Sequence, residues 1–416
     1  MSSFSIPLSG LDAYSSALSA VSNNLANLNT TGYKAETPLF SDLFYQQLGN
    51  TGAGDPIQVG NGSQIGGTET DFSTGSPQST GVPSDVAIQG NGLFVVNTNG
   101  ITTYTRNGNF IVNSTGDLTT SSGGLVMGYP AVNGAVNDNG VLGPIAMGAG
   151  QTSPPNATAN VTLGMNLDAS TAVGGTYSAP VTIYDALGAS HQLTFTFTEA
   201  AANSWNYTIT APQADIAGAA TNPVTLASGT LAFNGSGALT TTGPVAVKMP
   251  AGDSWANGAT VPATLFNWQL SSGGAPAITQ VASASAVLSN VQDGYPSGTL
   301  SNYSVEQDGT VEGTFSNGQS AALGQIALAN FANLQGLSRN GDGSFSSTLA
   351  SGAASVGVAG TGGLGTVAGG ELEMSNADIS TEFTQLIQDE TGYQANSRAI
   401  TTMDNVAQAA ISLIQA

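Results

Sequence analysis

A single histidine, His191, is the residue best suited to acid–base or nucleophilic chemistry in this sequence. With a serine and an aspartate beside it, an imidazole can take the proton of the serine hydroxyl, as in Ser-His-Asp hydrolases. Serine and aspartate occur throughout the chain. His191, however, lies in the strand-like run GASHQLTF, where a lone histidine is more often a surface or hydrogen-bonded residue. We therefore expect no catalytic histidine.

Two other patterns could hold a ligand. Residues 360–365 read GTGGLG, the glycine pattern of a dinucleotide-binding loop, but no helix opens directly after them. The carboxylate pairs Asp308 with Glu312 and Asp389 with Glu390 could act as acid/base pairs or calcium ligands, but no calcium-binding loop pattern is present. The chain has no cysteine, which excludes disulfides and thiolate metal sites. We expect no enzyme, no cofactor and no metal.

The composition limits the partners and the fold. The 416 residues carry a net charge of -21, which repels phosphate backbones, and no run approaches the roughly 18 apolar residues of a membrane span. We expect neither nucleic-acid binding nor membrane insertion. Only 7% of the residues are charged and 55 are glycine, a composition that favours β-rich domains with many turns. The length allows two or three domains.

The N-terminal residues predict a helix with one narrow apolar stripe. Ser9 and Asp12 have the spacing of a helix start, and Gly32 fits a helix stop. The apolar side chains recur at alternating steps of three and four, which is the seam of a coiled coil. These residues are Leu11, Tyr14, Leu18, Val21, Leu25 and Leu28.

A second stripe predicts a helix from about residue 376 to 415, at the other end of the chain. Ser375 and Asp378 have N-cap spacing, and Gly392 is the weak point of this helix. The apolar residues recur at seven-residue intervals: Ile379, Leu386, Tyr393, Ile400, Ala407 and Ile414. The two helices could pack on each other or on a domain, or other copies of the chain could complete their stripes. The residues alone leave both possibilities open.

The residues between the two predicted helices fall into segments with different hydrophobic and turn patterns. Residues 31–70 have no sustained helical period and are predicted to be a connecting segment. Short strand-like runs separated by Asn-Gly pairs predict β-structure at 71–150, and a proline-bearing stretch at 151–160 marks a boundary. Further strand patterns continue to about residue 285, and a third block returns to hairpins before the Gly-rich stretch 351–370, which reads as a flexible connector.

Several segments resemble the rod and hook family of bacterial flagellar axial proteins. The stretch ANLNTTGYKAETPLFSDLF resembles the segment after the family's first helix, and its matching positions are Asn27, Asn29, Thr30, Gly32, Tyr33, Lys34, Phe40, Asp42 and Phe44. The runs DVAIQGNGLFVV and YTRNGNFIVNSTGDL resemble the family's inner β-domain, and YQANSRAITTMDNVAQAAISLI resembles its C-terminal helix. VTIYDALGASHQLTFTF and the segment from GTLSNYSVEQDG to GDGSF are similar to hook subunits in particular.

The resemblance implies an α+β multi-domain protein, in which long N- and C-terminal coiled-coil-type helices pair in one domain and β-rich inner and outer domains are inserted between them. We expect a terminal helical assembly domain at 1–30 and 371–416, and a connecting segment at 31–70. An inner β-domain would comprise 71–150 and 286–370, with the Gly-rich connector at its end, and an outer β-domain 151–285.

The function implied by the resemblance is structural. Such a subunit polymerises with itself into the flexible hook tube of the flagellum, outside the cell, and transmits torque from rod to filament. Its expected partners are further copies, rod, hook-cap and hook-filament junction proteins, and the flagellar type III export apparatus. The alternatives are a distal rod or other axial protein, or, in a different class, a secreted β-rich adhesin or glycan-binding protein. The adhesin would not explain two terminal heptad stripes.

Overall fold

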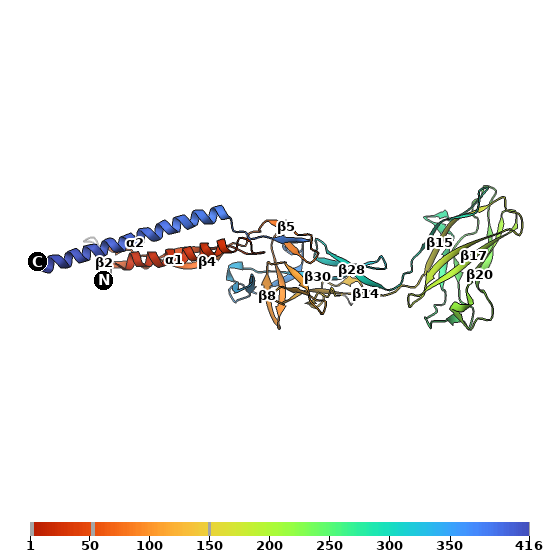
Figure 1. Ribbon diagram of the computed structural model, residues 1–416, viewed down its shortest axis with the longest axis horizontal. Helices are drawn as coiled ribbons and strands as arrows, with labels where there is room; N and C mark the ends of the chain where they lie inside the picture. The colour runs from red at the N-terminus through yellow and green to blue at the C-terminus, as the bar shows by residue number, and fades with distance from the viewer. Residues whose placement is uncertain (1–3, 51–54, 149–150, 416) are drawn as a thin grey trace. The chain divides into compact units, whose positions relative to one another are not determined.

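The computed structural model describes residues 4–50, 55–148 and 151–415, and only the backbone of residues 413–415. Most of it is β-structure, and one helix lies near each end of the chain (Figure 1). It forms two compact units. Unit 1 comprises the described parts of Met1–Ala149, Asn302–Thr314 and Ser320–Ala416, and unit 2 comprises those of Gly150–Ser301 and Phe315–Gln319.

The helices of unit 1 are α1 (Ser5–Ala26) and α2 (Ile379–Gln415). α1 begins before the predicted start, because the Ser9 hydroxyl donates to the Ile6 carbonyl inside the first turn instead of capping it. α2 begins at Ile379, three residues later than predicted, and the carboxylate of the preceding residue, Asp378, accepts the Thr381 amide at 2.8 Å. Among the described residues, no helix combines the length and apolar character that crossing a bilayer requires.

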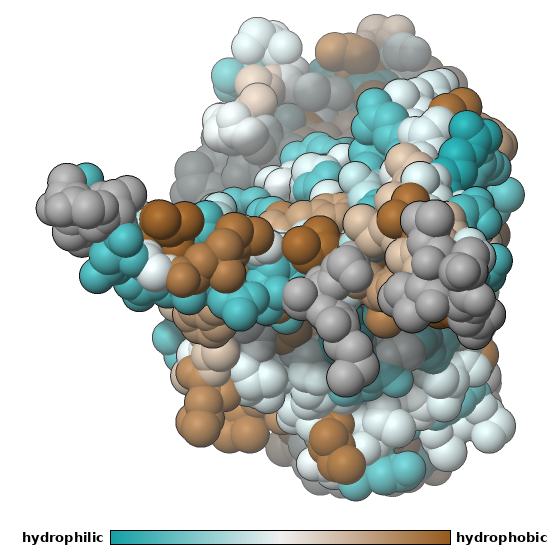
Figure 2. All heavy atoms as spheres, turned by 90° about the vertical axis from the view of Figure 1, so that its left-hand side faces the viewer, coloured by the Kyte–Doolittle hydropathy of each residue, from teal (hydrophilic) through white to brown (hydrophobic). Residues whose placement is uncertain are grey.

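The described residues of 36–50 and 55–70 form two antiparallel strand pairs, although the sequence predicted only a connecting segment. The strands are β1 (Glu36–Asp42) paired with β4 (Ser63–Thr70), and β2 (Gln46–Asn50) paired with β3 (Pro56–Val59). β1 and β4 pack on α1, and the rings of Phe40 and Tyr14 lie 5.2 Å apart. β2 and β3 are open to solvent, and Phe44, just before β2, is 96% exposed. Hydrophobic side chains stand among hydrophilic ones on the end of the molecule where the helices lie (Figure 2).

A large sheet forms the core of unit 1, with the strand order β29-β30-β11-β7-β8-β32-β31. Its buried side chains include Leu93, Phe331 and Phe345. The other described strands that lie wholly or partly in unit 1 extend this sheet or pair beside it. The bounds are β5 Pro77–Ser79, β6 Val86–Gln89, β7 Leu93–Thr98, β8 Ile101–Thr105, β9 Phe110–Val112, β10 Leu118–Thr120, β11 Leu125–Val132, β12 Ala135–Val136, β13 Gly143–Pro144, β28 Gly298–Val305, β29 Thr310–Phe315, β30 Ser320–Asn330, β31 Ser338–Gly341, β32 Ser344–Ser346, β33 Ser355–Val358, β34 Thr366–Gly369 and β35 Glu371–Glu373.

The Gly-rich stretch 351–370 is part of the fold of unit 1, and the prediction of a flexible connector is not met. β33 pairs antiparallel with β30, and β34 pairs antiparallel with β6. Glycine is needed at these positions because the chain passes close to other backbone. A Cβ atom at Gly365 would lie 2.3 Å from the Gln89 carbonyl oxygen. Strand pairing therefore orders a segment whose composition reads as a linker.

Unit 2 consists of two main sheets around one core. One sheet has the order β16-β17-β18-β20, and the other β21-β23-β15-β26, with β27 paired to β15. Trp268 is fully buried at the centre, with the Phe195 and Tyr207 rings edge-on to it. The bounds are β14 Thr152–Ser153, β15 Asn160–Asp168, β16 Thr176–Tyr184, β17 Ser190–Ala201, β18 Ser204–Ala211, β19 Ile216–Ala217, β20 Val224–Ala232, β21 Val245–Val247, β22 Ser254–Trp255, β23 Phe266–Gln269, β24 Ser271–Ser272, β25 Ala275–Pro276, β26 Ile278–Val281 and β27 Ala286–Gln292.

The boundary of unit 2 differs from the one expected from the sequence. The outer domain was predicted to end at residue 285, but β27 lies beyond that point and pairs with β15 over six positions. The strand therefore completes a sheet of unit 2, and the unit continues to Ser301.

Candidate functional site

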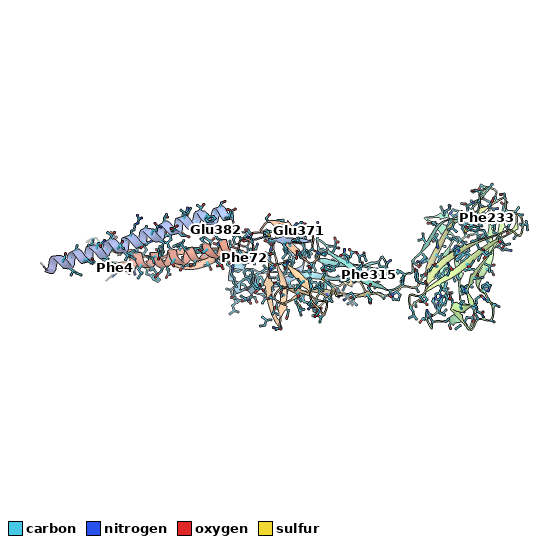
Figure 3. The ribbon with its side chains drawn as sticks, viewed as in Figure 1. Phe4, Phe72, Phe233, Phe315, Glu371 and Glu382 are labelled. Carbon is cyan, nitrogen blue, oxygen red and sulfur yellow. The ribbon has the colours of Figure 1, made fainter. Side chains whose placement is uncertain are left out.

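The two terminal helices pack against each other in antiparallel directions. Phe4, just before α1, and Glu382, near the start of α2, lie at opposite ends of the pair (Figure 3). A Cβ atom at Gly10 would lie 2.8 Å from the Asn396 side chain, and one at Gly392 would lie 2.5 Å from the Tyr14 ring. Farther along, the Asn24 amide donates to Glu382 at 3.1 Å. As residue numbers rise along α1, those of the facing residues fall by the same steps along α2.

Small residues bring the two helices close together. The buried face of α1 consists of Pro7, Gly10, Ala13, Ala17, Val21 and Asn24. Gly392, which the sequence marked as a weak point of α2, makes room for the Tyr14 ring. A helix without a side chain at such a position allows close approach of its neighbour, and this gain offsets the low helix propensity of glycine.

The predicted stripe of α1 lies beside this buried face. Of its six residues only Val21 is buried, and Leu11, Tyr14, Leu18, Leu25 and Leu28 are half-buried, with Leu28 beyond the end of the helix. On α2, four of the six predicted residues are half-buried: Leu386, Tyr393, Ile400 and Ala407. Ile379 is 52% exposed. The side chain of Ile414 lies outside the described residues.

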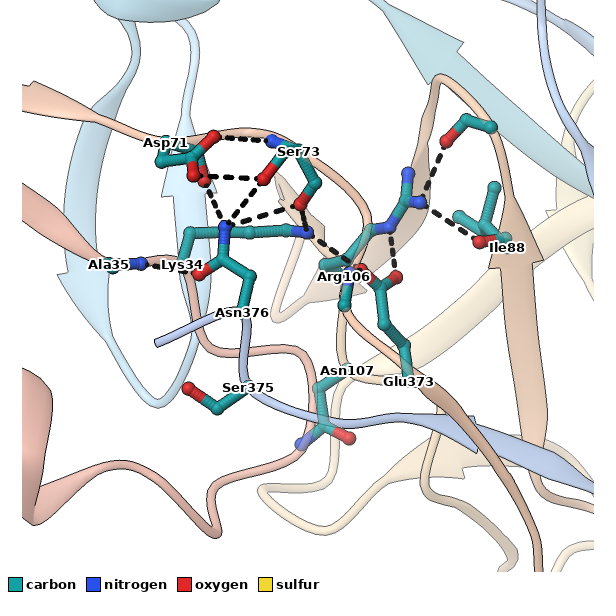
Figure 4. A network of polar contacts seen from close by, with 12 residues as sticks. Lys34, Ala35, Asp71, Ser73, Ile88, Arg106, Asn107, Glu373, Ser375 and Asn376 are labelled. Atoms are coloured by element: carbon teal, nitrogen blue, oxygen red, sulfur yellow. Dashed lines mark hydrogen bonds and ion pairs between the residues drawn. The ribbon is translucent and has the colours of Figure 1, made fainter. Parts of the chain in front are cut away.

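The base of the helix pair joins the β-structure through a buried carboxylate, Glu373. Lys34 Nζ lies 2.7 Å from one of its oxygens, and Arg106 Nε donates to the other (Figure 4). The Gly75 amide also donates to Glu373, at 2.7 Å. No more than 3% of any of the three charged side chains is exposed. One carboxylate therefore neutralises part of the charge of two buried cations.

Carbonyl groups accept the remaining hydrogen bonds of the two cations. Lys34 Nζ donates to the Ser73 carbonyl at 2.5 Å. The Arg106 guanidinium donates to carbonyls of the loop around Gly92, at Ile88, Gly90 and Gly92. Burial lowers the pKa of Lys34, and the Glu373 carboxylate opposes that shift. The network is thus nearly complete, as a buried charge cluster must be to persist.

Asn376 adds a second set of contacts between distant segments. Its side-chain oxygen accepts the Ala35 amide at 2.8 Å, and its side-chain nitrogen donates to the Asp71 and Ser73 carbonyls (Figure 4). We name the cluster of Lys34, Arg106, Glu373 and Asn376, with Ser73, the junction network. It ties the segment after α1, the segment after β4 and the segment before α2 into one rigid unit.

The Gly-Tyr-Lys positions of the family motif all serve this junction. Gly32 has a φ of +67°, and its amide donates to the Glu373 carbonyl at 2.7 Å. The buried Tyr33 hydroxyl donates to Asn24 at 3.0 Å, and burial raises its pKa. Arg339 donates to the Lys34 carbonyl, and its guanidinium lies over the Tyr33 ring. The resemblance identified these positions, but nothing in the sequence linked them to Glu373 and Arg106.

The other positions of the motif lie outside the junction network. Asn27 accepts the Thr30 hydroxyl at 3.0 Å, just after α1. Phe40, in β1, packs on Tyr14, as described above. Asn29, Asp42 and Phe44 are exposed. These positions form no common site with Lys34.

Replacement of Gly32 by alanine will destabilise the subunit more than replacement of Gly81, because the two glycines have the same backbone conformation but different surroundings. Both have φ near +70°, which costs an alanine about 1–2 kcal/mol. A Cβ at Gly32 would also lie 2.6 Å from the Asn107 amide nitrogen, whereas nothing lies within 4 Å at Gly81. Overpacking of this kind adds about 1–3 kcal/mol. Urea unfolding of both variants measures the difference, and equal losses would show that the junction has room for a side chain.

The residues considered for chemistry do not form a reaction centre. His191 is buried in unit 2, where its Nε2 lies 3.1 Å from Asp185 and its ring stacks on Trp255 at 3.7 Å. Residues 360–365 form the turn between β33 and β34, and a strand follows them. Within the described residues, no group of three His, Asp or Glu side chains could hold a metal ion.

Comparisons with known proteins match almost the whole chain. Sequence profiles described as "Flagella basal body rod protein", "Flagellar hook protein FlgE/F/G D1 domain", "Flagellar basal body protein FlaE D2 domain" and "Flagellar basal body rod FlgEFG protein C-terminal" match residues 6–34, 87–166, 154–295 and 368–413. A crystal structure of Helicobacter pylori flagellar hook protein FlgE2 covers 70% of this chain and 98% of its own at 14% identity, with a TM-score of 0.47, a likeness too distant to add to the sequence matches.

Two curated relatives extend over the full length. The flagellar hook protein FlgE of Escherichia coli is 34% identical over 99% of this chain and 99% of its own length. The flagellar hook protein FlgE of Salmonella typhimurium is 35% identical over 99% of this chain and 100% of its own length. Because these matches run from the terminal helices through both β-rich units, the chain belongs to the flagellar hook protein family.

Proposed function

We propose that this structural subunit of the flagellar hook polymerises through its terminal helix pair into a flexible tube that carries torque from rod to filament. The observation that carries the proposal is an uncovered apolar face on α2. Ile379, Phe383 and Ile387 are spaced by four residues on one side of the helix and are between 51% and 58% exposed. Such a face is costly in water unless another surface covers it. Further copies of the chain are the occupants that a hook polymer supplies.

The helix pair supports a coiled-coil-type assembly domain. One side of α2 packs on α1 through Gly392 and Asn396, and the apolar face lies elsewhere on the helix. The two helices can therefore pack on each other and also on helices of other subunits, because each contact would use a different side of the pair. Contact with α1 would place α2 for assembly, and the exposed face would supply the attraction between subunits.

The domain layout and the partners that we expect follow from membership of the family. We infer that the terminal helices form the assembly domain, that unit 1 beyond them is the inner β-domain, and that unit 2 is the outer domain. Rod, hook-cap and hook-filament junction proteins would be the neighbours, after export through the flagellar type III apparatus. The relatives are named as flagellar hook proteins, in agreement with the prediction that the chain is not an enzyme.

Bending of such a tube requires subunit contacts that lengthen and shorten without breaking. Exposed ion pairs contribute little to stability, but each fixes two surfaces in one geometry. The ion pairs of the junction network are buried, and the pair of Arg339 with Glu36 is half-buried. A Gly- and Ser-rich surface with few charges would therefore slide past the surface of a neighbouring subunit at a low cost in free energy. Large apolar interfaces between the outer domains would argue against this mechanism.

Electron microscopy of flagella from a strain that lacks only this chain tests the function. We expect basal bodies that have a rod but no hook, and therefore no filament and no motility. Basal bodies without a distal rod would indicate the alternative, a rod protein. Intact flagella would exclude both functions and leave the secreted β-rich adhesin as the remaining candidate. Expression of the chain from a plasmid should restore the hooks.

A further inference from the structure

Among the residues that the structure describes, Arg398 is the only exposed Lys or Arg side chain of unit 1. The sequence contains five basic residues, and one of them, Lys248, lies in unit 2. In unit 1, Lys34 and Arg106 are buried in the junction network, and Arg339 is half-buried in an ion pair. Arg398, on α2, is exposed. The other exposed charged side chains of the described part of unit 1 are therefore carboxylates.

Arg398 lies on the side of α2 that carries the exposed apolar face. Ile387 and Arg398 are about three helical turns apart, so their side chains leave the helix in nearly the same direction. Asn396, which meets α1, lies two residues before Arg398 and therefore on nearly the opposite side. The face that begins with Ile379 and Phe383 thus continues along α2 to Arg398.

The subunit itself supplies no counter-charge to Arg398. The ion pairs of the described part of unit 1 use its other three cations. The nearest exposed carboxylates on α2 are Glu390 and Asp404, more than one turn away, and they accept hydrogen bonds from Gln394 and Gln408. When another molecule covers this side of α2, the guanidinium loses water and needs a negative charge from that molecule.

We propose that, in the hook polymer, Arg398 of each subunit forms an ion pair with an exposed carboxylate on the helices of the next copy. This inference rests on the proposed function, because it extends the contact between subunits from the apolar face of α2 to a charged group on the same side. The exposed carboxylates on the two helices are Asp12 on α1 and Glu390 and Asp404 on α2. Charge complementarity therefore makes a second copy the fitting occupant.

The ion pair would fix the register of the contact. Apolar side chains attract one another in many alignments, because the hydrophobic effect has no direction. An ion pair forms in one alignment, and like charges that meet in another alignment repel. Each copy has a net charge of -21, so a single opposite charge at the contact also relieves part of the repulsion between copies. Arg398 thus contributes specificity to a contact whose attraction comes from the apolar face.

Polymerisation of the full-length chain at low ionic strength tests the pair. Sedimentation measures the critical concentration for assembly. We expect Arg398→Gln to raise the critical concentration by about tenfold. Arg398→Glu should raise it further, because a carboxylate would then face a carboxylate. Lys248→Gln and Lys248→Glu make the same charge changes at the exposed lysine of unit 2 and should assemble nearly as the wild type does.

A charge swap identifies the partner. Asp12→Arg, Glu390→Arg and Asp404→Arg are each combined with Arg398→Glu. We expect one of the three double variants to regain most of the assembly that Arg398→Glu loses. The other two have the same net charge and should remain defective, which separates a specific pair from a general effect of charge.

Normal assembly of both Arg398 variants overturns the inference, as does failure of all three double variants or equal recovery in all three. Phe383→Ser, which disrupts the apolar face, keeps this inference distinct from the proposed function. If only Phe383→Ser prevents assembly, the contact through α2 stands without the ion pair. If neither Phe383→Ser nor the Arg398 variants affect assembly, the ion pair and the proposed role of the apolar face are both wrong.

Discussion

Replacement of Glu373 by glutamine will lower the free energy of unfolding of the subunit by about 3–5 kcal/mol, the cost of removing one partner from a buried ion pair. Glutamine has nearly the shape of glutamate but no charge. Lys34 and Arg106 would then remain buried with no carboxylate between them, and at most 3% of either side chain is exposed to water. Urea unfolding, followed by circular dichroism, measures the loss.

The matched control for this substitution is Glu371→Gln. Glu371 lies two residues earlier in the same short strand, β35, and is half-buried, so the chemical change is identical. We expect it to alter the free energy of unfolding by no more than about 0.5 kcal/mol. Similar losses in the two variants would mean that the junction network does not hold unit 1 together.

A substitution of Leu386 by aspartate will stop polymerisation. Leu386 is half-buried on α2, one turn before Asp389, whose carboxylate has one buried oxygen without a hydrogen-bond partner among the described residues. Loss of a packed leucine costs about 2–5 kcal/mol, and a second carboxylate beside Asp389 adds repulsion. Every subunit of a tube repeats that loss, so growth should fail under conditions in which the wild type polymerises. Sedimentation and electron microscopy detect the polymer.

The monomer of this variant should keep its β-structure, because Leu386 has no part in the cores of unit 1 or unit 2 described above. Gln388→Asp is the matched control, since Gln388 is exposed only two residues away on the same helix. We expect Gln388→Asp to polymerise nearly as the wild type does. Normal tubes from Leu386→Asp would show that this side of α2 contributes nothing to assembly, and unfolding of the β-domains would show that it has a wider structural role.

Much of the local structure could be predicted from the sequence, because its causes are local. The spacing of Leu386, Tyr393 and Ile400 predicted α2. The Asn-Gly pair at 99–100 predicted the hairpin of β7 and β8, but the pairs at 91–92 and 107–108 join strands that do not pair with each other. The helix bounds were less accurate. The predicted N-cap spacing began at Ser375, but the helix starts only after Asp378, because Asn376 instead binds the backbone of Ala35 and Asp71. Hydrogen bonds from Asn376 to residues some 300 positions away in the chain therefore prevent the helix from starting where the local sequence predicts.

The buried face of α1 shows why a hydrophobic pattern is an incomplete guide. The sequence marks Leu11, Leu18 and Leu25 as the seam, but the most buried positions are Ala13, Ala17 and Val21. Alanine and glycine contribute little to a hydrophobic period, although they decide how closely a second helix can approach. The large side chains therefore flank the contact, and the small ones form it.

By itself, the sequence determined that this protein has a helix at each end, β-rich domains between them and the motif of a flagellar axial protein. Helical periods, turn pairs and contiguous motifs are short-range features that can be read directly from neighbouring residues. Only the tertiary structure decided that Lys34 and Arg106 share Glu373, that Gly392 accommodates Tyr14 and that one carboxylate oxygen of Asp389 is buried without a hydrogen-bond partner among the described residues. The reason is physical: burial and charge pairing depend on residues that meet in space, and Lys34 and Glu373 are 339 positions apart.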